Sequence, residues 1–307
     1  MNASFVRGVN IALVTACISG AAVFLNKFAA GSWADSSAFT TSRNLVTVMF
    51  LIGLVAALKK FGEMRRLSRN DWLNLVLLGF IGGSIPFLMF FKALTLIPAS
   101  EAAFIHKSLF LWVALFSYPF LRERLTSWQI AALGLFAAGI FISGAPGSWS
   151  FGIGFWLMLG ATLLWTAETV IAKIVLAKIS PVLVGWGRMF FGSLFLLAYL
   201  VATGGTQNLL PASYAEAGWL AISGAVLFGY VSTWYWALKH APATVVTSIL
   251  VVGAPITASL EALLVTHRFP VKLVLPSLLM ILGIALIAKR IENILSKLRS
   301  RSGEAYP

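Results

Sequence analysis

The chain has few charged residues and almost no cysteine or histidine. Charged residues make up 11% of its 307 residues, and it contains one cysteine and three histidines. Soluble proteins are about a quarter charged, so a large solvated surface is excluded. The single cysteine, Cys17, rules out an internal disulfide and a paired-cysteine metal site. We therefore expect neither a metal nor a cofactor.

Sequence motifs of common catalytic sites are also absent. The chain has no HExxH metal motif, no GxSxG nucleophile motif and no GxxxxGK phosphate loop. The missing phosphate loop excludes a pump driven by its own nucleotide hydrolysis. An intramembrane enzyme is a distant alternative, as is a channel, because a channel is expected to carry rings of like side chains. The chain is expected not to be an enzyme.

Long apolar stretches fill most of the chain instead. Hydrophobic residues make up 59% of it, and the mean hydropathy is +0.90. A helix needs about 20 apolar residues to cross about 30 Å of hydrocarbon. This pattern predicts an all-α integral membrane protein with ten transmembrane helices. The predicted windows are Val9–Phe28, Phe39–Leu58, Trp72–Leu96, Ala102–Phe120, Ser127–Ile142, Phe151–Ile171, Pro181–Val201, Ala217–Leu238, Ala243–Thr266 and Val271–Ala288.

The positive charge follows the predicted membrane topology. The net charge is +13, but the basic residues lie in the gaps between apolar windows, so nucleic-acid binding is not expected. With the N-terminus inside, 17 of the 23 lysines and arginines face the cytoplasm, as the positive-inside rule requires. We predict a multi-pass protein of a bacterial-type inner (plasma) membrane, with both termini cytoplasmic. The basic tail, residues 291–307, is either an amphipathic helix on anionic lipid or a solvated segment.

The chain contains a weak internal repeat. A shift of 144 positions aligns Ala93-Leu94 and Pro98-Ala99 with Ala237-Leu238 and Pro242-Ala243. Nearer the N-terminus, Lys27 aligns with Lys173 and Arg43 with Arg188. We predict a first repeat over 1–145 and a second over 146–290. Five helices in each make the repeats inverted, which is typical of alternating-access transporters with a central cavity; the alternative is a duplicated bundle without transport.

Two short motifs carry a family resemblance. Ala93-Leu94 ends the third window, and Glu123-Arg124-Leu125-Thr126 follows the fourth. With these motifs in a ten-span frame, nearly the whole chain resembles the EamA-type members of the drug/metabolite transporter superfamily. The second repeat departs from the pattern with His267-Arg268-Phe269-Pro270. Glu123 is therefore expected to tie a loop rather than to act on a solute.

Within that superfamily the chain is most similar to the YddG-type amino-acid exporters. This resemblance implies a secondary transporter that exports amino acids, including aromatic and neutral ones, with broad specificity. The alternative is export of drugs or of other metabolites such as nucleotide precursors. The expected partners are the small-molecule substrate and membrane lipid, and the sequence leaves the oligomeric state open.

Ionisable residues deep in a span are candidate functional residues, because burying them in lipid is costly. His106 and Lys107 lie inside the fourth window, and Glu101 precedes them. Lys107 is expected to bind a substrate carboxylate while Glu101 or His106 binds the ammonium; the alternative is an internal network that joins Lys107 to Glu101 or to the backbone. Other charged residues are interpreted as lying near span ends, where they can reach water: Lys27, Arg43, Lys92, Arg188 and Glu261.

Aromatic residues form a second candidate set. Trp165 and Tyr235 are expected to line the cavity, because flat solutes stack on such rings and cations sit over their faces. Small and helix-breaking residues are candidates for hinges or close packing. They are Gly82, Gly83, Pro86, Gly253 and Pro255.

Overall fold

All regular structure in the described part of the chain is helical. The computed structural model describes residues 3–123, 126–143, 151–267, 271, 274–283 and 285–286. The predicted tail and Arg124, Leu125 and Arg268 lie outside these residues. The helices are α1 (Ala3–Ser32), α2 (Ser36–Ala57), α3 (Phe61–Met64), α4 (Arg69–Gly83), α5 (Ile85–Leu96), α6 (Ala99–Lys107), α7 (Leu109–Leu121), α8 (Ser127–Ser143), α9 (Ile153–Val175), α10 (Pro181–Thr203), η1 (Thr206–Asn208), α11 (Tyr214–His240), α12 (Ala243–Leu250), α13 (Gly253–Glu261) and the π-helix η2 (Ala262–Thr266).

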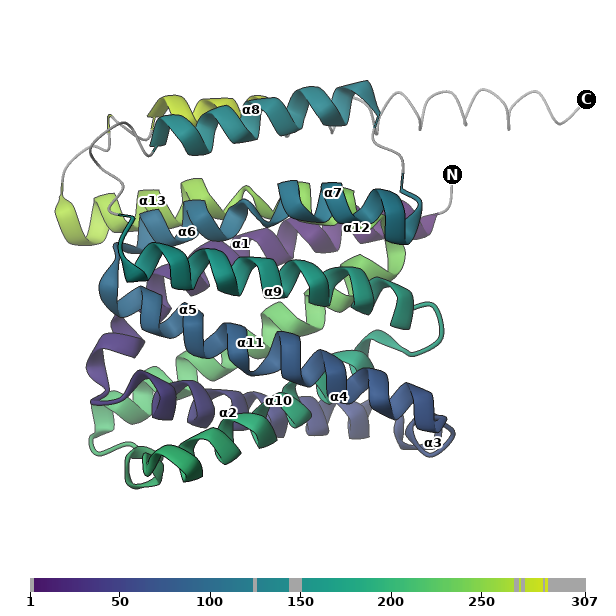
Figure 1. Ribbon diagram of the computed structural model, residues 1–307, viewed down its shortest axis with the longest axis vertical. Coiled ribbons are helices and arrows are strands. Elements are labelled where there is room, and N and C mark those ends of the chain that lie inside the picture. The colour runs from purple at the N-terminus through teal and green to yellow at the C-terminus, as the bar shows by residue number, and fades with distance from the viewer. Residues whose placement is uncertain are drawn as a thin grey trace, which may run out of the picture.

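Eight stretches of the described residues are long and apolar enough to cross a membrane. Three of them are built from successive helices: α4 with α5, α6 with α7, and α12 with α13 and η2. Ser127–Gly139 and Val274–Gly283, at the fifth and tenth predicted windows, are apolar but shorter. The two short helices lie together along one edge of the molecule (Figure 1), where Gly283 packs against the ring of Phe136.

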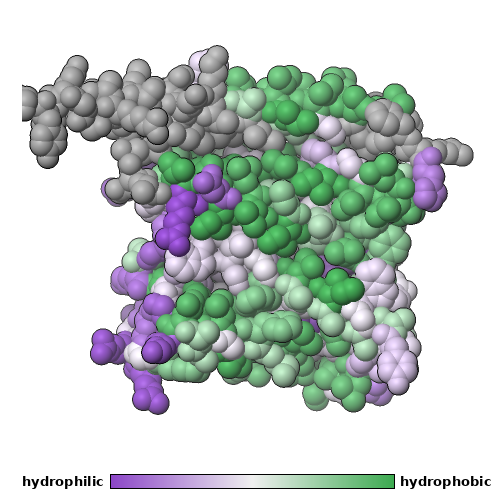
Figure 2. Space-filling model, turned by 180° about the vertical axis from the view of Figure 1, so that it is seen from behind, coloured by the Kyte–Doolittle hydropathy of each residue, from purple (hydrophilic) through white to green (hydrophobic). Residues whose placement is uncertain are grey.

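The outer surface is suited to lipid. Large apolar side chains point outward along the helices, as with Met49 (71% exposed) and Leu115 (63% exposed). Figure 2 shows a broad hydrophobic surface, with hydrophilic residues gathered toward the end of the molecule where α3 lies. Because water cannot solvate so much apolar surface, the hydrocarbon core of a membrane is the natural solvent for it.

The two halves of the chain are interleaved. The helix α1 of the first half packs mainly on α11 of the second, and α9 of the second packs mainly on α5 of the first. The helix α10 lies against α2 and α4, while α6 packs on α13 and α7 on α12. The walls of the interior are therefore built from both halves at once.

Two lysines close helix ends in equivalent ways in the two halves. Lys27 Nζ donates to the carbonyls of Leu94 and Ile97, at 2.6 and 2.8 Å, at the end of α5. Lys173 Nζ donates to the carbonyls of Leu238 and Ala241, at 2.5 and 2.7 Å, at the end of α11. The last carbonyls of a helix have no partner within it, so each ammonium satisfies them.

Candidate functional site

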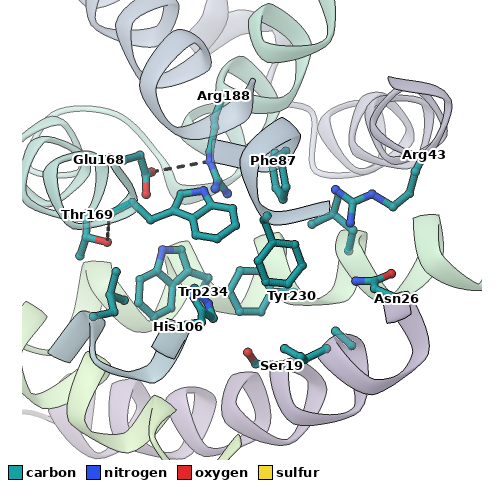
Figure 3. Close-up of a pocket in the computed structure, with 16 residues that line it drawn as sticks. Ser19, Asn26, Arg43, Phe87, His106, Glu168, Thr169, Arg188, Tyr230 and Trp234 are labelled. Atoms are coloured by element: carbon teal, nitrogen blue, oxygen red, sulfur yellow. Dashed lines mark hydrogen bonds and ion pairs between the residues drawn. The ribbon is translucent and has the colours of Figure 1, made fainter. Parts of the chain in front are cut away.

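A cavity lies between the two halves. Helices α1, α2, α5, α6 and α7 line it from the first half, and α9, α10 and α11 from the second (Figure 3). The lining residues are Ser19, Ala22, Val23, Asn26, Arg43, Phe87, Phe90, His106, Leu109, Trp165, Glu168, Thr169, Arg188, Leu227, Tyr230 and Trp234.

Two arginines face each other across one aromatic ring. Arg43 on α2 is 1% exposed and Arg188 on α10 is 3% exposed. Their guanidinium carbons lie 4.7 and 5.3 Å from the centre of the Phe87 ring, between them in Figure 3. The interpretation that these arginines lie near span ends and reach water is wrong. Each is the eighth residue of its helix, about two turns inside, and its side chain points into the protein.

The hydrogen bonds of the two guanidinium groups are incomplete. Arg43 Nη2 donates to Asn44 Oδ1 at 2.7 Å, and Arg188 Nη2 donates to the Gly82 carbonyl at 2.9 Å. Arg188 Nε lies 3.8 Å from Glu168 Oε1, too far for a hydrogen bond. Buried Arg43 Nε and Arg188 Nε and Nη1 find no hydrogen-bond partner among the described residues. Each guanidinium therefore keeps at least one N–H donor that no described residue satisfies.

The lining carries more positive than negative charge. Among its residues, Glu168 is the single carboxylate facing Arg43 and Arg188. Glu168 also accepts a hydrogen bond from the hydroxyl of Tyr235. One guanidinium charge is thus left without a counter-charge within the lining. Buried charges are costly unless paired, so an anionic group is the complementary guest.

Aromatic rings make up much of the remaining cavity wall. The Trp165 ring lies 5.2 Å from Phe87, 5.4 Å from Phe90 and 5.0 Å from His106, all edge to face. Its indole N–H donates to the Gly82 carbonyl at 2.9 Å, which fixes the ring. Tyr230 and Trp234 stack with centroids 5.9 Å apart. Such a wall accepts flat apolar groups and the faces of its rings accept cations.

The predicted site residues take different positions. His106 and Trp165 line the cavity. Tyr235 is buried behind the lining and holds Glu168. Lys107 is 1% exposed and lies outside the lining, and its Nζ donates to Ser19 Oγ at 2.6 Å. Its hydrogen bond therefore goes to Ser19 and not to Glu101.

Glu101 lies away from the cavity, in the first turn of α6. It is half-buried, and its Oε1 has no hydrogen-bond partner among the described residues. Sequence reasoning did not select Arg43, Arg188, Glu168 or Phe87 as site residues. A usable signal was present, because Arg43 and Arg188 align in the internal repeat and the lipid interior rarely tolerates two such residues.

The small residues of the third span lie beside the site. Helix α4 ends at Gly83, and α5 begins with Pro86 in its first turn. A Cβ atom on Gly82 would lie 2.3 Å from Glu168 Cγ, and one on Gly83 would lie 2.2 Å from the Arg188 carbonyl oxygen. The missing side chains let α4 approach α9 and α10 closely, and they leave the Gly82 carbonyl free to bind Trp165 and Arg188.

The ninth predicted span breaks in a similar way. Helix α12 ends at Leu250 and α13 begins at Gly253, with Pro255 in its first turn. A Cβ atom on Gly253 would lie 2.9 Å from Lys107 Cε and 3.1 Å from the Ala16 carbonyl oxygen. The fourth span breaks after Lys107, so the two interruptions adjoin. Broken helices of this kind line binding sites in many transporters.

Comparison with known proteins identifies the family. A model of the EamA-like transporter family matches residues 6–145 and again residues 152–289. The chain belongs to the EamA-like transporter family. It is also similar to an uncharacterized transporter of Archaeoglobus fulgidus, with 23% identity over 259 residues that cover 82% of this chain and 86% of the relative. A crystal structure of 18% sequence identity has the same fold, with a TM-score of 0.68 over 94% of this chain and 98% of that one.

The two matches of the family model correspond to the two halves of the chain. Each half contains one EamA repeat. Membership in this family makes the chain a solute transporter that crosses a membrane several times.

Proposed function

We propose that this EamA transporter is a secondary exporter of amino acids, including aromatic and neutral ones, of the YddG type. The observation that carries the proposal is the composition of the cavity wall. Guanidinium groups, a carboxylate and aromatic rings meet around one cavity. An amino acid carries the complementary groups, namely a carboxylate, an ammonium and a side chain that packs on rings. Drugs and nucleotide precursors remain the alternative cargo.

Alternating access between two inverted repeats of five spans is part of this proposal. The reciprocal packing of α1 on α11 and α9 on α5 supports it, because inverted repeats exchange equivalent contacts. The equivalent lysine bonds at Leu94 and Leu238 support it as well. In this view, Ser127–Gly139 and Val274–Gly283 belong to the fifth and tenth spans, and the basic end of the molecule faces the cytoplasm of a bacterial-type cell.

The decisive experiment is counterflow in liposomes. Purified protein is reconstituted, loaded with unlabelled amino acid and supplied with labelled threonine, methionine or phenylalanine outside. We expect uptake that saturates with concentration, since each cycle requires solute to occupy a finite site. Empty liposomes and the variant Met49→Ala, changed on the lipid-facing surface, provide the controls.

The alternatives predict different results in the same assay. Flux that rises linearly with concentration would indicate a channel. Counterflow of drugs or nucleotide precursors but of no amino acid would reject the proposed substrate class while leaving secondary transport in place.

A further inference from the structure

We propose that Arg43 and Arg188 together form the subsite that binds the carboxylate of the carried solute. It follows that the transporter accepts solutes with a carboxylate and rejects analogues that lack one. This inference rests on the proposed transport function and adds the chemical group, a carboxylate, by which the protein recognises its substrate. It places the carboxylate at the arginine pair instead of at Lys107.

The first argument is position. The two arginines are the eighth residues of α2 and α10, and they come from different copies of the EamA unit. Both guanidinium groups lie on the ring of Phe87, at 4.7 and 5.3 Å from its centre. A carboxylate bound at this pair would therefore lie between the two copies.

The second argument is the set of free donors. Asn44 and the Gly82 carbonyl each hold one terminal nitrogen, which fixes the planes of the two groups. The remaining buried donors, Arg43 Nε and Arg188 Nε and Nη1, have no partner among the described residues. An unsatisfied buried donor is costly, and a carboxylate oxygen is an acceptor that would satisfy one.

The third argument is that Glu168 cannot neutralise both arginines and that the ammonium of Lys107 is already bound elsewhere. Glu168 lies 3.8 Å from Arg188 Nε and accepts the Tyr235 hydroxyl, so it neutralises at most one of the two arginines. The ammonium of Lys107 is bound to Ser19 Oγ. The free donors of the arginine pair, in contrast, belong to residues that line the cavity itself. Glu168 then lies where the ammonium of an amino acid would be received.

A matched series of solutes tests the carboxylate requirement. Unlabelled phenylalanine, 3-phenylpropanoate, 2-phenylethylamine and phenylalaninamide compete with labelled phenylalanine in the liposome assay. We expect the two carboxylates to compete, and the amine and the amide to compete at least about tenfold less well, because they cannot accept two charged hydrogen bonds. Equal competition by the amine, or competition by inorganic phosphate alone, would overturn the inference.

Substitutions test whether the two arginines bind the carboxylate. Arg43→Lys and Arg188→Lys keep the charge but lose the fork, and we expect each to raise the half-saturating concentration about tenfold or more. Lys92→Gln removes an exposed cation of α5 and serves as the matched control, expected to behave like the parent. A half-saturating concentration unchanged in both arginine variants contradicts the subsite.

Direct binding separates this inference from the proposed function. The melting temperature of the detergent-solubilised parent protein is measured with 3-phenylpropanoate and with 2-phenylethylamine. We expect the carboxylate alone to raise it, because a ligand that binds the folded state stabilises it. No rise with any carboxylate would overturn the subsite. Carboxylate binding without transport would instead reject only the transport proposal, and this test needs no variant to fold.

Discussion

At the scale of single residues, Gly83 illustrates how tightly the site is packed. A Cβ atom there would lie 2.2 Å from the Arg188 carbonyl oxygen and 3.0 Å from Gly192 Cα, both backbone atoms that cannot turn aside. We expect Gly83→Ala to lower the free energy of unfolding by about 1–3 kcal/mol, since overpacking forces a shift of α4 against α10. Thermal melting in detergent measures this change.

The chain supplies a matched control for that substitution. Gly53 lies within α2 and is exposed, and a Cβ atom there would meet nothing within 4 Å. We expect Gly53→Ala to leave the melting temperature unchanged or to raise it, because alanine favours helix by about 0.5–1 kcal/mol over glycine. Equal melting of the Gly83→Ala variant and the parent would contradict the close packing.

The sequence indicated some of the residues that line the cavity, but not the direction in which the buried arginines point. The sequence selected His106 as an ionisable group inside an apolar window and Trp165 as a ring on which a flat solute could stack, and both line the cavity. It assigned Arg43 and Arg188 to the helix ends, because the predicted ends could not show which way a long side chain points. That direction depends on Phe87 and the Gly82 carbonyl, which belong to other helices.

At the scale of helices, acidic residues bind the starts of distant helices. Glu123, just after α7, accepts the backbone N–H groups of Ala243 and Thr244 at 2.9 and 3.0 Å, at the start of α12. Glu261, at the end of α13, accepts the backbone N–H of Ser100 at 2.8 Å, at the start of α6. Each copy of the EamA unit thus caps the N-terminus of a helix in the other copy. Glu123 does tie a loop, as expected from the sequence.

We expect Glu123→Ala to destabilise the protein by about 0.5–2 kcal/mol, the usual cost of losing a helix N-terminal cap. Glu123→Gln should fall between the parent and the alanine variant, since its amide keeps one accepting oxygen. The measurement is thermal melting in detergent. If the alanine variant and the parent have the same melting temperature, the contact contributes nothing to stability.

At the scale of the whole molecule, the proposed topology makes a simple prediction. Reporters fused to the C-terminus of the full chain, one active only in the cytoplasm and one only outside it, should both indicate the cytoplasm. The reason is the even number of spans combined with a basic end retained inside. An N-terminal fusion should agree. Termini on opposite sides of the membrane would make the number of spans odd and would end the inverted-repeat proposal.

The fold was largely predictable because lipid imposes one rule along the chain. Each apolar window of about 20 residues has to become a helix, and the described helices follow the predicted windows. The interruption at Ser84 lies between Gly83 and Pro86, which the sequence marked as candidates for a hinge or close packing, whereas the interruption at Ser108 was not predicted. The pairing of α1 with α11 was also not predicted, because no local pattern records which helix from the other half becomes a neighbour.

The interleaved packing has a consequence for synthesis. The ribosome makes α1 first, yet the helix against which α1 mainly packs begins only at Tyr214. Likewise Arg43 enters the bilayer long before its counterpart at position 188 exists. The first copy is therefore inserted before its packing partners in the second copy exist. Its contacts with the second copy, such as that of α1 with α11, form only after α11 has been inserted.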